Sequence, residues 1–292
     1  MPTLEISGST MRTVPEVGQN MHIIENSALE WLLFDRSLVG LEFTRLCEAA
    51  SCCFLRHYEA ELKNQGEALA ELMILSKGQY YWFHNAFEKT HNENLQTNFI
   101  ATNRVQVAGD NVQILVSYRN YDAPADQLLI GDTVASGGTI CNALDDYLKK
   151  RSIDKLYLFS IAGTRIGAIR IAKFCKERGI ELQCAFGLAL FGLGENGFDL
   201  SFLHPDTLTS PKYINLANKI YEGKQISVAG WDFGSQSQSP QKYRNLSWME
   251  AKKWRMEGSD LFKLAEMPES LQLIEKERDA FRFLPLPDKN KV

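Results

Sequence analysis

The sequence lacks the apolar runs that mark membrane and exported proteins. No window approaches the roughly 18 consecutive apolar residues that a membrane helix needs. Met1–Glu16 is polar and has no basic start followed by an apolar stretch, so we expect no signal peptide. From these two absences we expect a cytoplasmic protein that has no membrane partner.

An excess of positive charge is missing too. The chain has 32 Lys and Arg residues against 36 Asp and Glu residues, which gives a net charge of -4. A protein that binds nucleic acid needs a basic face that displaces counterions from the phosphates. We therefore expect no nucleic-acid partner, whereas a small local anion site remains compatible with this balance.

Cysteine is sparse and shows no metal-binding pattern. None of the six cysteines forms a CxxC pair that is matched by a second pair or by histidines at metal-ligand spacing. We expect them to be small buried side chains of a reduced protein, rather than a disulfide framework. They are Cys47, Cys52, Cys53, Cys141, Cys175 and Cys184.

Strand and helix patterns alternate through the middle of the chain. Apolar positions at helical spacing predict two or three helices over residues 27–66, after a loose segment Met1–Asn20. The expected strands are Ala70–Leu75, Thr97–Thr102, Val112–Tyr118, Gln127–Ile130, Lys155–Ile161 and Glu181–Leu190, and the expected helices are Gln79–Lys89, Thr139–Lys150 and Arg165–Arg178. This order predicts an α/β fold with a mostly parallel twisted sheet flanked by helices.

The pattern divides the chain into three predicted parts. Residues 1–66 form an N-terminal helical extension, residues 67–190 form the α/β core, and residues 191–292 form a C-terminal hood or cap packed on the core. Glycines and prolines, Pro205 and Pro211 among them, break the start of the third part repeatedly. Two helices are expected later, over Ser247–Ser259 and Pro268–Phe283.

One segment of the core has the residues that a phosphate site needs. The apolar strand ends at Gly131-Asp132, and Ala135-Ser136-Gly137-Gly138-Thr139 opens a helix. In an open parallel sheet, ligands lie beyond the carboxyl ends of the strands, where loop amides and the helix dipole attract anions. Glycines allow close backbone approach, and Ser136 and Thr139 add hydroxyl donors. An ordinary connection with a good helix cap is the alternative.

The whole segment from Gly131 to Thr139 resembles the phosphoribosyl pyrophosphate signature of type I phosphoribosyltransferases. That signature has an apolar strand, two acidic residues, a short spacer and Thr-Gly-Gly-Thr or a close variant. The resemblance implies that Asp132 contacts the ribose hydroxyls and that Thr133 is a substrate-binding residue. It also implies that the ribose 5-phosphate is bound by Ala135, Ser136, Gly137, Gly138 and Thr139. The sequence departs at Gly131, where many members have the first acid. Ala135 replaces the acidic residue of 6-oxopurine enzymes, so hypoxanthine or guanine is not the expected acceptor.

A second segment is similar to the pyrophosphate loop of that family, which is often a strand followed by Arg-Gly-Gly or Arg-Ala-Gly. Here a strand is followed by Ser76-Lys77-Gly78. The resemblance implies that Lys77 supplies positive charge and that Gly78 allows close approach. A plain strand-to-helix turn with a surface lysine is the alternative. The order and distance of the two segments make the pair more specific than either alone.

Two further similarities concern the rim of the expected site. Thr102-Asn103-Arg104 begins a polar stretch between two strands, where the family has a mobile loop, and Arg104 would contact the pyrophosphate unless it is only a surface residue. Gly192–Phe198 and Trp231–Gly234 are weakly similar to the hood loops of uracil phosphoribosyltransferases. Trp231 and Phe233 would stack on a base or pack in the interior.

The resemblance implies transfer of a phosphoribosyl group from phosphoribosyl pyrophosphate to a nitrogenous small-molecule acceptor, with release of pyrophosphate. The expected catalytic residues are Asp132 and Lys77, and the expected cofactor is Mg²⁺ bound with the donor. A homodimer is one assembly that we consider. Two alternatives stay open: a non-catalytic regulatory protein that binds phosphoribosyl pyrophosphate or a nucleotide, and a structural subunit with a vestigial loop. The absence of the first acid at Gly131 favours the regulatory alternative.

Overall fold

The computed structural model describes residues 8–35, 38, 40–63, 68–75, 78–106, 112–197, 199–228 and 250–256. Its main helices are α1 (Ser27–Phe34), α2 (Gly40–His57), α3 (Glu59–Leu62), the 3₁₀ helix η2 (Gly78–Tyr81), α4 (Phe83–His91), α5 (Gly138–Leu148), α6 (Arg165–Glu177) and α7 (Pro211–Tyr221). The large sheet contains β1 (Thr10–Thr13), β2 (Met21–Glu25), β3 (Leu69–Leu75), β4 (Gln96–Gln106), β5 (Val112–Asn120), β6 (Gln127–Gly131), β7 (Lys155–Ser160) and β9 (Glu181–Gly187).

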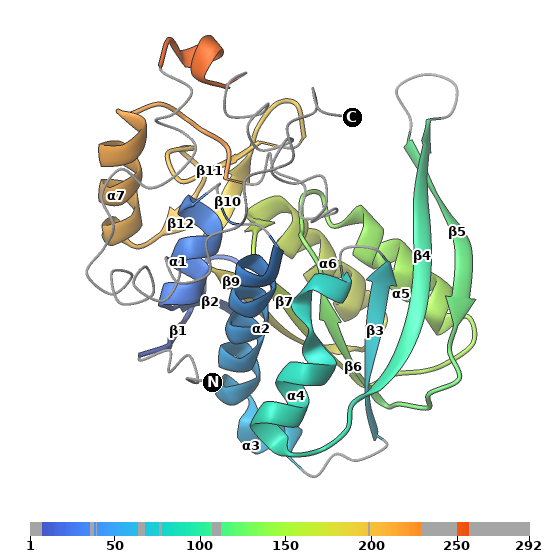
Figure 1. Ribbon diagram of the computed structural model, residues 1–292. Coiled ribbons are helices and arrows are strands. Elements are labelled where there is room, and N and C mark those ends of the chain that lie inside the picture. Colours follow the sequence, from blue (N-terminus) through green and yellow to red (C-terminus); the bar gives the residue numbers. More distant parts are fainter. Residues whose placement is uncertain are drawn as a thin grey trace, which may run out of the picture.

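This sheet has the strand order β1-β2-β9-β7-β6-β3-β4-β5. The six strands from β2 to β4 run parallel, and antiparallel pairs form at both edges, β1 with β2 and β4 with β5. Figure 1 shows the sheet between its helices. The predicted α/β class with a mostly parallel, helix-flanked sheet is confirmed.

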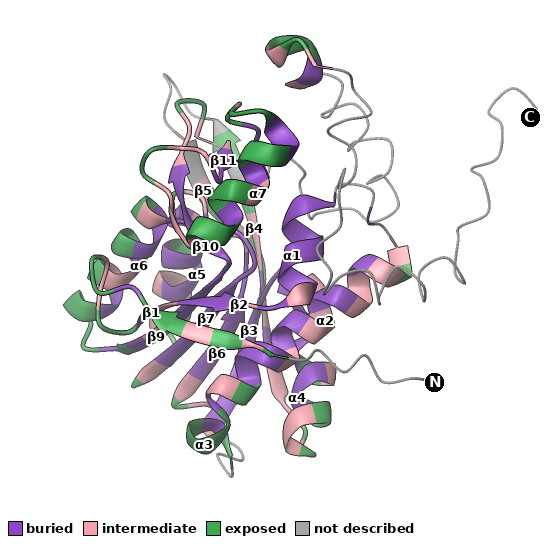
Figure 2. Ribbon diagram, turned by 90° about the vertical axis from the view of Figure 1, so that its left-hand side faces the viewer, coloured by how far each residue is buried: buried purple, intermediate pink, exposed green. Residues whose placement is uncertain are grey.

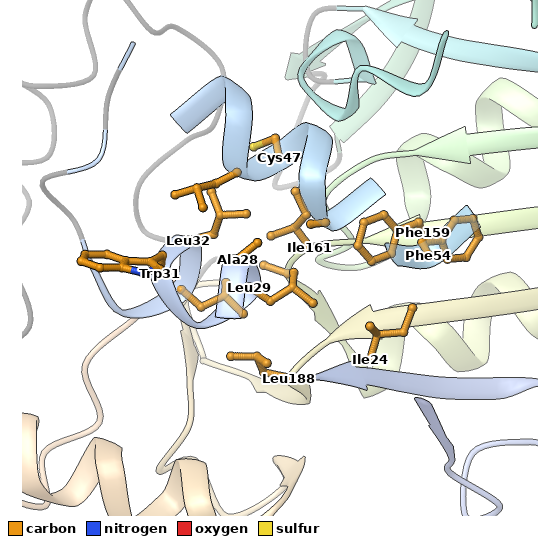
Figure 3. Packing of buried hydrophobic residues seen from close by; sticks show 14 of the residues in the cluster. Ile24, Ala28, Leu29, Trp31, Leu32, Cys47, Phe54, Phe159, Ile161 and Leu188 are labelled. Carbon is orange, nitrogen blue, oxygen red and sulfur yellow. The ribbon is translucent and has the colours of Figure 1, made fainter. Parts of the chain in front are cut away.

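The two faces of the sheet are covered by different helices. One apolar cluster joins α1, α2, α4 and α7 to one face, and a second joins α5 and α6 to the other. Figure 3 shows the first cluster, in which Phe54 of α2 stacks on Phe159 of β7 with ring centroids 5.0 Å apart. Figure 2 shows that the central strands are buried, while the outer sides of the helices are exposed. Among the residues described, no helix is both long and apolar enough to cross a membrane.

The structure differs from the sequence-based expectation at both ends of the described chain. The expected loose segment Met1–Asn20 contains β1, and β2 follows and pairs in parallel with β9. Pro211 begins helix α7 instead of breaking the chain, because a proline at the first helical position loses no hydrogen bond. The expected helix Pro268–Phe283 lies outside the described residues, and only residues 250–256 of the expected helix Ser247–Ser259 are described.

Two predicted elements of the core are each interrupted. Gln79–Lys89 is η2 followed by α4, because Trp82 between them has φ 52°. Glu181–Leu190 is divided into β9 and the short strand β10 (Ala189–Leu193) at Leu188, which has φ 57°. These left-handed conformations are uncommon for residues other than glycine, so the sequence gives little warning of them. The expected boundaries of the remaining core elements agree with the structure within a few residues.

Candidate functional site

The two segments singled out in the sequence follow neighbouring parallel strands. β3 pairs with β6 in the register Glu71–Leu129, so both strands end at the same edge of the sheet. Gly78, just beyond β3, approaches the end of β6 so closely that a Cβ atom on it would lie 3.3 Å from the carbonyl oxygen of Gly131. The structure therefore places Gly78 beside the strand that leads into the phosphate-loop candidate.

The phosphate-loop candidate, residues 132–139, consists of a loop and the first two residues of α5. Gly137 has φ 73°, a conformation that glycine adopts without strain, and its carbonyl accepts the N–H of Cys141 at 3.1 Å. The N-cap residue of this helix, Gly137, makes no side-chain cap hydrogen bond. The N–H groups of the first helical turn and the positive end of the helix dipole suit a bound anion. Ser136, next to these groups, is exposed.

Hydrogen bonds connect this loop to the N-terminus of α6. Val134 forms a parallel bridge with Gly163, and the Thr164 N–H donates to the Val134 carbonyl at 2.9 Å. The Thr164 hydroxyl donates to the Ala135 carbonyl at 2.5 Å and accepts the Gly167 N–H at 2.9 Å as the cap of α6. One buried side chain thus holds the phosphate-loop candidate and α6 together.

Gly167 completes this contact because it has no side chain. A Cβ atom on it would lie 2.4 Å from the Ala135 carbonyl oxygen and 2.5 Å from a Val134 methyl group. We expect Gly167→Ala to lower the free energy of unfolding by about 1–3 kcal/mol, the usual cost of overpacking. Urea denaturation measures this loss. Lys176→Ala on the same helix is the control, and equal stability of the two variants would contradict the close contact.

Asp132 lies under the loop rather than on its rim. It is only 3% exposed, and one carboxylate oxygen accepts the N–H of Thr133 at 2.7 Å. Burial, together with the nearby Asp132 charge, raises the pKa of the Tyr81 hydroxyl, which accepts the Ile161 N–H at 3.0 Å. The carboxylate thus organises the loop in this structure, and its expected contact with ribose hydroxyls stays a prediction.

Aromatic rings fill the space beside Gly131, the position of the first acid in the signature that the segment resembles. A Cβ atom on Gly131 would lie 2.4 Å from the Tyr81 ring and 2.8 Å from the Phe83 ring. Tyr81 is held there by its hydrogen bond to Ile161 and by an edge-on contact with Phe159, with ring centroids 5.7 Å apart. Packing therefore requires glycine at position 131, because the rings leave no space for a side chain there.

Ser76 and Lys77, the other predicted residues of the pyrophosphate loop, lie outside the described residues. Arg104 lies within β4, which continues to Gln106, instead of beginning a polar connection. Its backbone pairs with Ile114 of β5, and Ile114 is 3.7 Å from the position of a Cβ atom on Gly138. The β4–β5 hairpin therefore extends beside the phosphate-loop candidate.

The expected hood begins with a small sheet that is tied to the same loop. β10 pairs in parallel with β8 (Gly163–Thr164) and antiparallel with β11 (Leu200–Ser201) and β12 (Leu208–Thr209). Of the expected hood loop Gly192–Phe198, residues 192–193 belong to β10 and residues 194–197 form the turn towards β11, with the Gly194 N–H bonded to the Asp199 carbonyl. Trp231–Gly234 lies outside the described residues, so its stacking role stays a prediction.

Three residues that hold the site were not singled out from the sequence. Thr164 could have been recognised as a helix cap, because a threonine before a helical pattern is a typical cap. No pattern in the sequence indicates that Thr164 and Gly167 contact a loop some 30 residues earlier. Tyr81 had no signal, since its partners Gly131 and Ile161 are brought to it by the sheet. Among the described residues, no three His, Cys, Asp or Glu side chains are grouped as a metal site.

No protein-family model matches this sequence, and no curated protein matches it. Among solved structures, the AQ2163 protein from Aquifex aeolicus is similar over 60% of this chain and 91% of its own, with 14% identity and a TM-score of 0.47. A hypoxanthine-guanine phosphoribosyltransferase from Bacillus anthracis covers 51% of this chain and 80% of its own, with 11% identity and a TM-score of 0.32. Orotate phosphoribosyltransferase from Aeropyrum pernix covers 47% and 70%, with 12% identity and a TM-score of 0.29.

Proposed function

We propose that this chain binds phosphoribosyl pyrophosphate at the loop 132–139 and transfers the phosphoribosyl group to a nitrogenous small-molecule acceptor. The observation that carries the proposal is the approach of two glycine-containing segments at one edge of the sheet. Gly78 lies against Gly131, and the N-terminus of α5, with glycine as its N-cap residue, follows six residues later. A donor with a phosphate at one end and a pyrophosphate at the other needs two adjacent anion sites of this kind.

The proposed reaction requires no covalent bond between the protein and the substrate. The bond between ribose C1 and the pyrophosphate oxygen breaks, its electron pair leaves with pyrophosphate, and a nitrogen lone pair of the acceptor forms the new bond to C1. The acceptor nitrogen then loses its proton. Catalysis consists of holding the donor, stabilising the leaving anion and orienting the acceptor. In the proposal Ala135–Thr139 anchor the 5-phosphate, Asp132 positions the ribose, and Lys77 and Arg104 stabilise pyrophosphate.

Mg²⁺ is the proposed cofactor, and it would enter with the donor. In the proposal the ion is held mainly by pyrophosphate oxygens and water, which are the ligands that Mg²⁺ prefers. In the proposal Asp132, at the start of the loop, is the carboxylate beside the ribose. When bound, the ion would offset the negative charge of the pyrophosphate.

A second candidate function is that of a regulatory protein that binds the donor or a nucleotide without turning it over. The specific observation in its favour is the packing at Gly131, where Tyr81 and Phe83 occupy the space of a second carboxylate. Two measurements separate the candidates. Calorimetry with phosphoribosyl pyrophosphate and Mg²⁺ tests binding, and pyrophosphate release with a panel of nitrogenous bases and amines tests transfer. Binding without release supports the regulatory function, and absence of binding contradicts both.

Asp132→Asn tests the proposed ribose contact, because it keeps the shape of the side chain and removes its charge. Loss of a charged hydrogen bond to the ribose hydroxyls should weaken donor binding or turnover by about tenfold or more. Calorimetry with ribose 5-phosphate and with inorganic phosphate provides the comparison, since phosphate lacks the hydroxyls. If both ligands lose affinity equally, Asp132 acts only by organising the loop.

A further inference from the structure

We infer that Arg170 of α6 is a ligand-binding residue of this site and contacts the 5-phosphate of a sugar phosphate. The inference rests on the proposed function, because it assumes that the loop 132–139 holds that phosphate. This loop contains no lysine or arginine of its own. Its amides and hydroxyls would therefore bind a phosphate with two negative charges, and no cation of the same segment would offset that charge.

The contact between α6 and the loop brings Arg170 to the open side of the loop. Gly167 packs under Gly137, where a Cβ atom would lie 2.8 Å from the Gly167 carbonyl oxygen, and Ile171 lies 3.2 Å from the same position. Residues three and four positions after Gly167 share its helix face. Arg170 is therefore directed at the next part of the loop, and its Nη1 lies 3.5 Å from the position of a Cβ atom on Gly138.

The present hydrogen bond of Arg170 is weak enough to be exchanged for a ligand. Its Nη1 donates to the Ser136 carbonyl at 3.5 Å, the long limit for such a bond. The side chain is exposed and lines a groove of about 370 Å³ between α5 and α6. A small rotation of an exposed side chain would move the guanidinium from this carbonyl to a phosphate beside it.

The surrounding charges also distinguish Arg170 from its neighbours. Lys173 pairs with Glu177 at 3.8 Å, and Arg178 pairs with Asp145 at 3.0 Å. Within the described part of the chain, Arg170 has no carboxylate within ion-pair distance. Its charge is thus available to a ligand, and the planar guanidinium fits two phosphate oxygens at once. The ligand class is a phosphate monoester on a sugar.

The test compares Arg170→Ala and Arg170→Lys with Lys173→Ala, a matched control on the same helix and groove. Calorimetry measures the binding of ribose 5-phosphate and of ribose to each variant, after circular dichroism has shown that the fold is kept. We expect Arg170→Ala to weaken ribose 5-phosphate binding by about tenfold to a hundredfold, the range for a charged hydrogen bond. Arg170→Lys should lose less, and Lys173→Ala should match the wild type.

Each outcome decides between the inference and the function on which it rests. Wild-type affinity of Arg170→Ala for ribose 5-phosphate, while the native chain binds it, overturns the role of Arg170 and leaves the proposed function intact. Failure of the native chain to bind ribose 5-phosphate or phosphoribosyl pyrophosphate overturns both. Equal weakening by Arg170→Ala and Lys173→Ala would show a general charge effect and would also overturn the inference.

Discussion

Gly131→Asp, which introduces the first acid of the type I phosphoribosyltransferase signature that this segment resembles, should destabilise this chain severely and should not improve donor binding. The new side chain would meet the Tyr81 and Phe83 rings at distances below any normal contact. Overpacking costs about 1–3 kcal/mol, and burying an unpaired carboxyl group adds a further penalty. We expect a loss of about 4 kcal/mol in the free energy of unfolding, seen as a melting temperature lower by about 10 °C.

A double-mutant cycle can separate the steric effect of the Tyr81 ring from the effect of the new charge. Gly131→Ala introduces the clash without charge, and Tyr81→Ala removes the ring that causes it. If the Tyr81 ring occupies the space beside Gly131, the double variant Gly131→Ala/Tyr81→Ala should lose less free energy of unfolding than the two single variants lose together. The reason is that the stability effects of residues in contact are coupled. Additive losses, or a Gly131→Asp variant that is stable and turns over faster, would contradict the packing account.

Gly138→Val should abolish most binding of ribose 5-phosphate while leaving the fold intact. A Cβ atom on Gly138 has ordinary contacts with Ser136, Arg170 and Ile114 at 3.5–3.7 Å, so a branched side chain would fill the space between the loop, α6 and the hairpin. We expect at least about a hundredfold weaker binding, equivalent to about 2.8 kcal/mol. Calorimetry measures the affinity of the variant for ribose 5-phosphate, at a temperature where the variant and the native chain are both folded.

Gly138→Ala is the graded control, because its single methyl group fits at those distances. It should retain affinity within a few-fold of the native chain. Gly137 is unsuited to this test, since its φ of 73° and its contact with the Gly167 carbonyl would make any substitution a folding defect. Equal binding by Gly138→Val and the native chain would place the phosphate elsewhere.

The parts of this site that are local in sequence could be predicted, and those that depend on distant contacts could not. The strand before Gly131 and the helix after Gly137 follow from apolar periodicity and glycine placement, and both lie where expected. The burial of Asp132 could not be predicted, because burial depends on packing that no local pattern reports, and its contact with the sugar stays a prediction.

Long-range contacts explain what was missed. Tyr81 fills the space at Gly131 only because β3 and β6 are adjacent, and Thr164 bonds to Ala135 only because β7 lies next to β6. β2 joins the core sheet through pairing with β9, which follows it by more than 150 residues. A helical extension was the natural expectation for this region, since helices do follow directly after β2.

The most direct test of the account is to observe the loop while the ligand is added. Amide NMR spectra of isotope-labelled protein, with the signals of Gly137, Gly138 and Thr139 assigned, would be followed during titration with ribose 5-phosphate. The account predicts saturable shifts of these three amides, with much smaller shifts in α7 on the far face of the sheet. Shifts that leave the three amides unchanged while others saturate, or no saturable shift at all, would contradict the central claim.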